Sequence, residues 1–400
     1  VEDALGGVLC RCTGYAKIVD AVLDAATVGN APEPPAAGAA VGARLERLDG
    51  KPKVLGAEVY GADCVLHDTL EVRAIRAPNH AARFTLGDTD AWAAAAPGAV
   101  RVFTAADIPG ANLFGTIPSF ADQPALAEDR IRHRGEAVAI VVGETACLDA
   151  LDFTAFPVTW SPEPAATDLD TPTHRAVHDN RPDNLLIAGL VRTGDADAAL
   201  ASSAHVAEGR IETPYVEHAY IEPEAGIAWL DGDTLCIQAC TQAPVMDRDD
   251  TARILGLARQ KVRIVPAAAG GGFGAKLDLS VQPLIGLAAL KSGRPCRMVY
   301  SRTESMMSTT KRHPAKMTGR IGCDAAGRIT AMTFDGDFNT GAYSSWGPTV
   351  AVRVPVHASG PYRTPHYHAK ARAVHTNGPS SGAFRGFGVP QAAILQETLY

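Results

Sequence analysis

The sequence predicts a mixed α+β fold with more than one domain. The chain has 400 residues, more than one ordinary domain. Short strand patterns alternate with helical patterns over residues 45–160, and a strand, a glycine-rich loop and a helix follow one another over residues 262–291. The formal charge is −7 and no run of about 20 apolar residues occurs. We therefore expect neither nucleic-acid binding nor a membrane span.

The N-terminal residues predict the end of a helix over residues 2–9 and a second helix over residues 16–26. Between them lies the turn Cys-Arg-Cys-Thr-Gly-Tyr, in which one residue separates Cys10 from Cys12. Two thiolates at this spacing can hold one iron of a cluster, and two buried thiols are the alternative. Residues 27–42 contain three prolines and no apolar period, which predicts a linker.

The clearest strand patterns of the following region lie at residues 71–77, 99–104 and 137–142, and a helix is expected at residues 90–96. The continuous apolar run before residue 143 predicts a strand that is buried on both faces. Three arginines surround His133, and this basic cluster (Arg130, Arg132, His133, Arg134) favours a solvated loop. Residues 161–204 are rich in proline and aspartate, which predicts a connecting arm.

Carboxylates are dense over residues 213–224. General acid or base work by Glu217, His218 or Glu222 is conceivable, and a buried polar network is the favoured alternative. Residues 234–242 then alternate as a strand does, so Cys236 and Cys240 share one face about 13 Å apart. That distance is too long for two ligands of one metal, and we expect core residues.

The most informative stretch, residues 262–276, is a short apolar run that opens into four glycines at positions 270, 271, 272 and 274. Such a loop lets backbone N–H groups approach an anion closely. A Walker A loop is excluded because Leu277 follows Lys276 where magnesium would need a hydroxyl. The spacing of Gly270, Gly272 and Ala275 also suits a dinucleotide-binding turn, with Arg302 where an acidic residue is usual. A turn without a ligand is the third alternative.

A second glycine-rich stretch, Ala-Phe-Arg-Gly-Phe-Gly-x-Pro-Gln, occupies residues 383–391. Together with Gly-Gly-Gly-Phe-Gly-Ala-Lys at residues 270–276 it resembles the molybdenum hydroxylase family of xanthine dehydrogenases and aldehyde oxidoreductases. The pair of motifs is far more specific than either one. The resemblance implies four parts: residues 1–27 as the C-terminal part of a 2Fe–2S domain, 28–44 as a linker, 45–160 as an α/β hammerhead domain, and 161–400 as a truncated molybdopterin-binding domain.

The resemblance also implies the cofactors. We expect molybdenum with molybdopterin in its cytosine dinucleotide form, and a 2Fe–2S cluster with Cys10 and Cys12 among its ligands. The linker is too short for a flavin domain, so we expect no FAD and an electron acceptor other than NAD, in the form of a partner subunit or carrier. The other two cluster cysteines and the family's Gly-x-Gly-Glu general base do not occur in the sequence. We therefore expect turnover to need further polypeptide.

The implied reaction is hydroxylation of an aldehyde or an aromatic N-heterocycle, with water as the oxygen source. Arg353 and Phe387 are expected in the substrate pocket, and Gln242 is expected to donate its amide N–H to the cofactor. The residues expected to hold the cofactor are Gln242, Gly271, Gly272, Phe273, Gly274, Ala383, Phe384 and Arg385. We further expect a homodimer or hetero-oligomer in the cytoplasm, since the eight cysteines form no secreted disulfide pattern. The alternatives are an NADP-dependent dehydrogenase and a non-catalytic assembly subunit.

Overall fold

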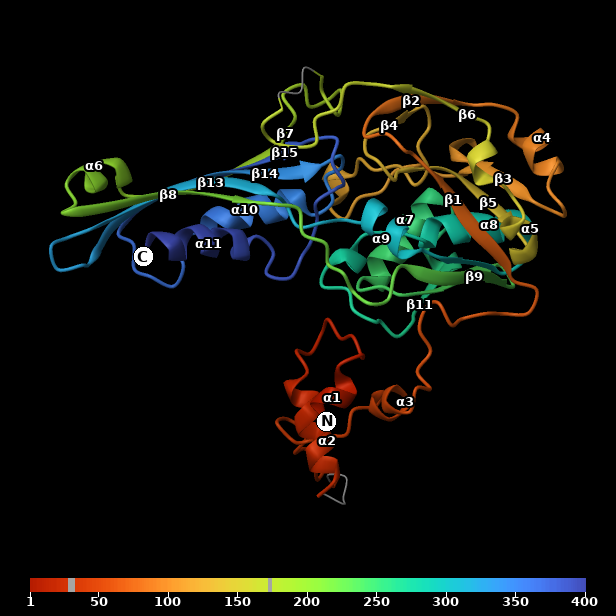
Figure 1. Cartoon of the computed structure of the whole chain (residues 1–400), viewed down its shortest axis with the longest axis horizontal. Helices are drawn as coiled ribbons and strands as arrows, with labels where there is room; N and C mark the ends of the chain where they lie inside the picture. The colour runs from red at the N-terminus through yellow and green to blue at the C-terminus, as the bar shows by residue number, and fades with distance from the viewer. Residues whose placement is uncertain (28–32, 172–174) are drawn as a thin grey trace.

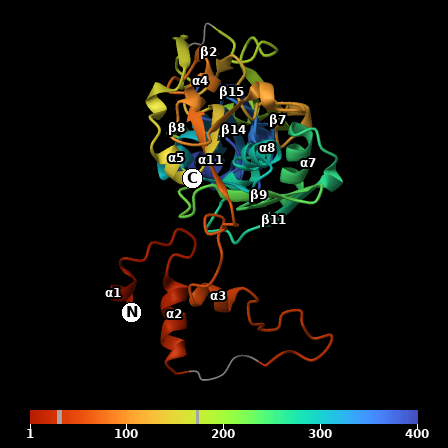
Figure 2. The same cartoon turned by 90° about the vertical axis from the view of Figure 1, so that its right-hand side faces the viewer.

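The computed structural model describes residues 1–27, 33–171 and 175–400, so part of the expected linker lies outside the described residues. The N-terminal part contains three short helices, α1 (Glu2–Leu5), α2 (Ala16–Ala25) and α3 (Gly50–Val54). None of them contains a buried residue. They lie below the body of the molecule in both views (Figure 1, Figure 2). The two helices expected before residue 27 are confirmed, although the first ends at Leu5.

The body is organised around a seven-stranded sheet with the strand order β11-β10-β9-β12-β1-β5-β3. Its strands are β1 (Leu70–Arg76), β3 (Arg101–Thr104), β5 (Ala137–Gly143), β9 (Ala225–Asp231), β10 (Thr234–Ala239), β11 (Val262–Pro266) and β12 (Cys296–Val299). Two helices, α7 (Pro244–Ile254) and α8 (Gln282–Ser292), pack near β9 to β11. β5 is buried from its second residue onward, which confirms the expectation from its continuous apolar run.

This sheet crosses the domain boundary that the sequence predicts at residue 160. β1, β3 and β5 come from before that residue, and β9 to β12 come from after it. The two halves join where β1 pairs in parallel with β12, with Leu70 opposite Cys296. They also share one hydrophobic core, in which Ile140 packs with Leu235 and Ile285. The division at residue 160 therefore remains a prediction.

A three-stranded sheet, β4-β2-β6, packs against β1 and β5 of the large sheet. It consists of β2 (Ala82–Leu86), β4 (Arg130–Ile131) and β6 (Val158–Pro162), with α4 (Thr89–Ala94) and α5 (Thr145–Asp149) nearby. The expectation of a solvated basic loop beside it is wrong for two residues. His133 is buried, and so is Arg130, whose Nε donates to Glu163 at 3.1 Å. A half-buried partner acid, 33 positions away in the sequence, compensates the charge of the buried Arg130.

The C-terminal part of the body is a five-stranded sheet, β7-β15-β14-β13-β8. Its strands are β7 (Leu185–Thr193), β8 (His205–Thr213), β13 (Ala315–Cys323), β14 (Ile329–Gly341) and β15 (His366–His375). Helices α10 (Gly347–His357) and α11 (Val389–Leu399) lie along one face of it (Figure 1). The two remaining α-helices of the described residues are α6 (Ala196–Ala201) and α9 (Arg302–Ser308). The connecting arm expected over residues 161–204 contains a strand that the sequence analysis did not predict, since β7 pairs with β15 at the edge of this sheet.

Candidate functional site

The first glycine-rich loop leads from β11, an edge strand of the large sheet, to the start of α8. A Cβ at Gly272 would lie 2.5 Å from the Gln242 side-chain oxygen, and a Cβ at Gly274 would lie 2.6 Å from the Ala383 carbonyl oxygen. Gly274 also has a φ of +114°, which L side chains rarely adopt. Only glycine allows the neighbouring segments to come this close.

The second glycine-rich loop ends where α11 begins, at Val389, and it lies against the first loop. The Arg385 N–H donates to the Phe273 carbonyl oxygen at 2.8 Å, and Gly274 abuts the backbone of Ala383. The structure thus brings together the two sets of residues, 271–274 and 383–385, that the sequence assigns to one site. Their role in holding a cofactor remains a prediction.

Gln242 lies beside the first loop, just beyond the end of β10. Its backbone N–H donates to the Lys276 carbonyl at 2.8 Å, and its Oε1 accepts from the Gly274 N–H at 2.9 Å. The side chain is exposed, and its amide N–H groups donate to no residue that the structure describes. Gln242 therefore presents free donors at the loop surface.

Two buried ion pairs lie behind the loops. Lys276 is within 2.7 Å of Glu222, and their side chains are only 1% and 8% exposed. Lys311 is within 2.7 Å of Glu217. These pairs confirm the expected polar network over residues 213–224. Because Glu217 and Glu222 are both paired with lysines, neither carboxylate is free to act as a general base. Arg302 donates at 2.7 Å to the carbonyl oxygens of residues 220 and 221, which removes the cation invoked for an NADP-binding turn.

His218 connects this network to the second loop. Its Nε2–H donates to the Ala383 carbonyl at 2.8 Å, and its ring stacks on Phe384 with 4.0 Å between the centroids. Burial is the largest cause that lowers the pKa of His218, to about 4, so the ring is neutral near pH 7. A neutral imidazole that is fixed by a hydrogen bond and by ring stacking positions the second loop and is poorly suited to act as a general acid.

Backbone strain gathers around the two loops. Four residues other than glycine have a positive φ there, between 41° and 52°: Ala219, Phe273, Ser345 and Phe387. Such conformations persist only where the surrounding contacts fix them, and they cluster at functional sites. Phe273 and Phe387 belong to the loops themselves, so the strain supports the assignment of a site to this place.

The two residues expected in the substrate pocket lie next to each other. Arg353, exposed on α10, stands over the Phe387 ring with 4.9 Å from its guanidinium carbon to the ring centroid. The Trp346 ring meets Phe387 edge-on at 5.8 Å. Arg312 stands over Phe384 at 3.9 Å. Neither Arg312, Arg353 nor Arg385 forms an ion pair with a carboxylate of the described residues, so positive charge accumulates on this face.

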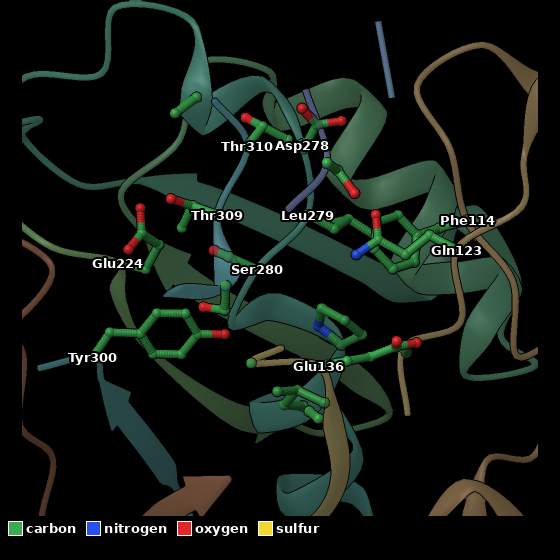
Figure 3. A pocket seen from close by; sticks show the side chains of 18 of the residues that line it. Phe114, Gln123, Glu136, Glu224, Asp278, Leu279, Ser280, Tyr300, Thr309 and Thr310 are labelled. Carbon is green, nitrogen blue, oxygen red and sulfur yellow. The ribbon is translucent and has the colours of Figure 1, made fainter. Parts of the chain in front are cut away.

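A cavity of about 70 Å³ is lined by Ala275 and Lys276 and by residues next to strands from both halves of the large sheet (Figure 3). The motifs did not indicate its polar lining: Glu136, Glu224, Asp278, Tyr300 and Thr310. Neither Gln242, Arg353 nor Phe387 lines it. Asp278 accepts hydrogen bonds from Ser345 Oγ at 2.9 and 3.0 Å, and Ser345 is one of the strained residues. Asp278 thus connects the end of the first loop to the wall that carries Trp346.

Burial also sets the ionisation of two acids near the first loop. It raises the pKa of Asp247 and of Asp278 to about 7 each. An unfolded aspartate titrates near 3.9, so between about pH 4 and 7 the folded chain binds more protons than the unfolded chain. These two acids then contribute stability that falls as the pH rises through this window.

We expect the stability contributed by Asp278 to decrease by a few kcal/mol from pH 5 to pH 8, since a tenfold change in proton affinity is worth about 1.4 kcal/mol. Denaturant unfolding of the wild type and of an Asp278→Asn variant isolates this contribution. The stability of Asp278→Asn relative to the wild type should rise over this range, whereas that of Asp152→Asn, a change at an exposed site, should stay constant. An identical pH dependence of stability in all three proteins would contradict the assignment.

The two N-terminal cysteines are free thiols on the turn before α2. Cys10 Sγ lies 3.2 Å from Thr13 Oγ1, and that hydrogen bond is the largest cause that lowers the pKa of Cys10. Cys12 is exposed. Arg11, between them, donates from Nε to the His218 carbonyl at 3.4 Å. The turn therefore lies against the segment that supports the second loop. Cys236 and Cys240 are buried, as expected for core residues.

The structure contains a largely buried cluster that the sequence analysis did not predict. It consists of Asp122, His178 and His375, whose potential metal-ligand atoms lie within 4.8 Å of one another. The Arg181 guanidinium donates to Asp122 at 2.7 Å and to His375 Nε2 at 3.0 Å. His178 Nε2 donates to the Ala342 carbonyl. The Arg181 guanidinium thus occupies the place in this cluster where a metal cation would otherwise supply positive charge.

Comparison with known proteins agrees with this architecture. The molybdopterin cofactor-binding domain profile matches residues 177–400, and the aldehyde oxidase and xanthine dehydrogenase a/b hammerhead profile matches residues 55–161. The chain is 37% identical over 365 residues to the nicotinate dehydrogenase large molybdopterin subunit of Eubacterium barkeri, covering 89% of this chain and 84% of that protein. It is 36% identical over 360 residues to a probable xanthine dehydrogenase subunit of Bacillus subtilis, covering 88% of this chain and 47% of that one.

Among solved structures, the aldehyde oxidoreductase of Desulfovibrio desulfuricans superimposes with a TM-score of 0.90 at 28% identity, over 98% of this chain and 46% of that chain. The mixed α+β fold is thereby confirmed. The chain spans about half the length of two of these three proteins. The matches support neither the dinucleotide-binding dehydrogenase nor the assembly subunit. Among the described residues, no helix combines the length and the apolar character needed to cross a bilayer.

Proposed function

The chain belongs to the molybdopterin-binding family of aldehyde oxidases and xanthine dehydrogenases, and on that premise we propose that it is the cofactor-binding part of a molybdenum hydroxylase. Its substrate is an aldehyde or an aromatic N-heterocycle, and water supplies the oxygen. The single observation that carries this proposal is the contact between the two loops, Arg385 N–H to Phe273 carbonyl, beside the free amide of Gln242.

The residues around this contact fit a phosphate-bearing pterin. Arg312 and Arg385 have no carboxylate partner among the described residues, so an anionic group would find positive charge that is not already neutralised. The close packing at Gly272 and Gly274 leaves a surface of backbone against which a flat ligand can lie. Residues 271–274 and 383–385 would hold the cofactor between them.

When bound, the molybdenum cofactor supplies the two-electron redox chemistry. The protein orients the substrate and stabilises charge. Gln242 donates its amide N–H toward the cofactor, and Phe387 offers a ring face for stacking. Arg353 neutralises the negative charge that develops on the substrate during hydroxylation. Its position over Phe387 supports the assignment of both residues to one substrate pocket.

The finer assignments belong to the same proposal. We assign the cytosine dinucleotide form of the pterin, and we assign Cys10 and Cys12 to a 2Fe–2S cluster whose other ligands come from elsewhere. Electrons leave through that cluster to a protein acceptor, within a homodimer or hetero-oligomer in the cytoplasm. Because no Gly-x-Gly-Glu occurs in the sequence, the general base comes from further polypeptide, and residues 1–400 alone should not turn over.

The substrate class can be tested at Leu277, which ends the short helical turn after the first loop. Purine hydroxylases of the family carry a glutamate at this motif position, and a leucine leaves the polar edge of a purine without a partner, at a cost of about 1–3 kcal/mol. We expect the assembled enzyme to have a higher kcat/KM for nicotinate or aromatic aldehydes than for xanthine.

A substrate panel on the wild type and on Leu277→Glu measures this preference. The variant should gain activity on xanthine relative to aldehydes, whereas Leu277→Gln, which has a similar size but no charge, should gain less. Xanthine as the best substrate of the wild type would contradict the assignment.

A further inference from the structure

Residues 217–222 form a short segment, here called the strap, that runs between the two glycine-rich loops. At its first end the buried His218 donates to the Ala383 carbonyl of the second loop. At its other end the Glu222 Oε2 accepts from the Gly270 N–H of the first loop at 2.7 Å. Ala219 between them has a φ of +51°, and Arg302 holds the carbonyls of residues 220 and 221. The strap is therefore fixed along its length and contacts both loops.

The Glu222 carboxylate joins three segments at once. Its Oε2 accepts from Gly270 N–H and from Lys276 Nζ, each at 2.7 Å, and the lysine also donates to the Glu222 carbonyl at 3.0 Å. The Oε1 accepts from the Gly61 N–H at 3.1 Å. Lys276 ends the same loop that Gly270 begins. One carboxylate thus closes the first loop upon itself and binds it to a segment that precedes the large sheet.

Two segments that precede the large sheet contact the strap, one at each of its ends. Arg11, between the two cysteines, donates to the carbonyl of His218. Gly61 binds Glu222, and Tyr60 beside it forms a parallel bridge with Ala268 at the start of the first loop. A Cβ at Gly61 would lie 2.8 Å from the Ala225 carbonyl oxygen, so this approach requires glycine.

We propose that the strap is a coupling element: Glu222 and His218 are positioning residues that fix the spacing of the two loops and make it depend on the docking of the two segments that carry Arg11 and Gly61. The role of the loops as the cofactor cradle rests on the proposed function. The coupling itself rests only on the contacts above. In this account displacement of the segment that carries Gly61 loosens the first loop even when no loop residue is changed.

Hydrogen exchange of backbone amides, followed by mass spectrometry on the full chain within its complex, tests the coupling. A glutamine at position 222 has one acceptor oxygen, so Glu222→Gln cannot accept from both Gly61 and Gly270, and it leaves Lys276 buried without a counter-charge. We expect exchange over residues 268–274 to rise about tenfold, with exchange in β13 and β14 unchanged.

Gly61→Ala provides a second test that leaves the ion pair intact. It should raise exchange over residues 268–274 in the same direction. The control is Asp233→Asn, which breaks an exposed ion pair with Lys261 beside β11 and should change nothing over those residues. Wild-type exchange over residues 268–274 in either Glu222→Gln or Gly61→Ala would overturn the proposal.

The molybdenum content of the same preparations separates this inference from the proposed function. Faster exchange in a complex that never contains molybdenum would leave the coupling in place and refute the cofactor role. Bound molybdenum together with unchanged exchange in Gly61→Ala would refute the coupling and leave the cofactor role in place.

Discussion

Replacing Gly274 by alanine is expected to lower the molybdenum content of the purified complex at least about tenfold, while the sheets stay folded. The new Cβ would lie 2.6 Å from the Ala383 carbonyl oxygen and 2.8 Å from its carbon. Both are backbone atoms, so the clash can be relieved only by moving the loops apart. The φ of +114° adds strain of about 1–3 kcal/mol. Metal analysis together with circular dichroism measures the outcome.

Gly327→Ala is the matched control. Gly327 also has a positive φ, of 77°, but nothing lies within 4 Å of a Cβ built there. This variant therefore carries the cost of backbone strain without a clash between loops, and it should retain its molybdenum. If Gly274→Ala retained as much molybdenum as Gly327→Ala, the two loops would not form the cradle.

The second large effect is expected at Arg353. Arg353→Gln should reduce kcat/KM by about 100-fold, because loss of one group that stabilises transition-state charge commonly costs a factor of about 100 to 1,000. We expect most of the loss in kcat, with molybdenum content unchanged, since Arg353 contacts Phe387, which lies outside residues 271–274 and 383–385 that would hold the cofactor. Steady-state kinetics on the assembled enzyme measures the effect.

Arg328→Gln serves as control, because Arg328 is an exposed residue in the turn between β13 and β14. It should leave both kinetic constants at their wild-type values. Equal activity of the Arg353→Gln and Arg328→Gln variants would contradict the assignment of Arg353 to the substrate pocket. Loss of molybdenum from Arg353→Gln would instead make it a cofactor residue.

The parts of the site that could be predicted from sequence are those with local signals. The resemblance carried by the two glycine motifs implied a shared site, and the close backbone approach that glycine allows is found at Gly272 and Gly274. The alternation of residues 234–242 predicted buried cysteines because a strand alternates its faces, and Cys236 and Cys240 are buried. In both cases neighbouring residues carry the pattern.

The parts that sequence could not predict depend on distant partners. Arg130 is buried because Glu163 is available to it, and Asp278 became part of the site through Ser345, 67 positions away. The large sheet joins β1 to β12 across the expected boundary, and no local pattern indicates which strand will pair with which. β7 was missed because it is an edge strand, whose Leu190 is 61% exposed and therefore lacks a buried pattern.

The measurement that tests the central claim most directly is the molybdenum and pterin content of the natively purified complex that contains this chain. The account predicts about one molybdenum with one pterin per chain, both lost in Gly274→Ala and retained in Gly327→Ala. A complex without molybdenum or pterin, and with NADP bound instead, would contradict it.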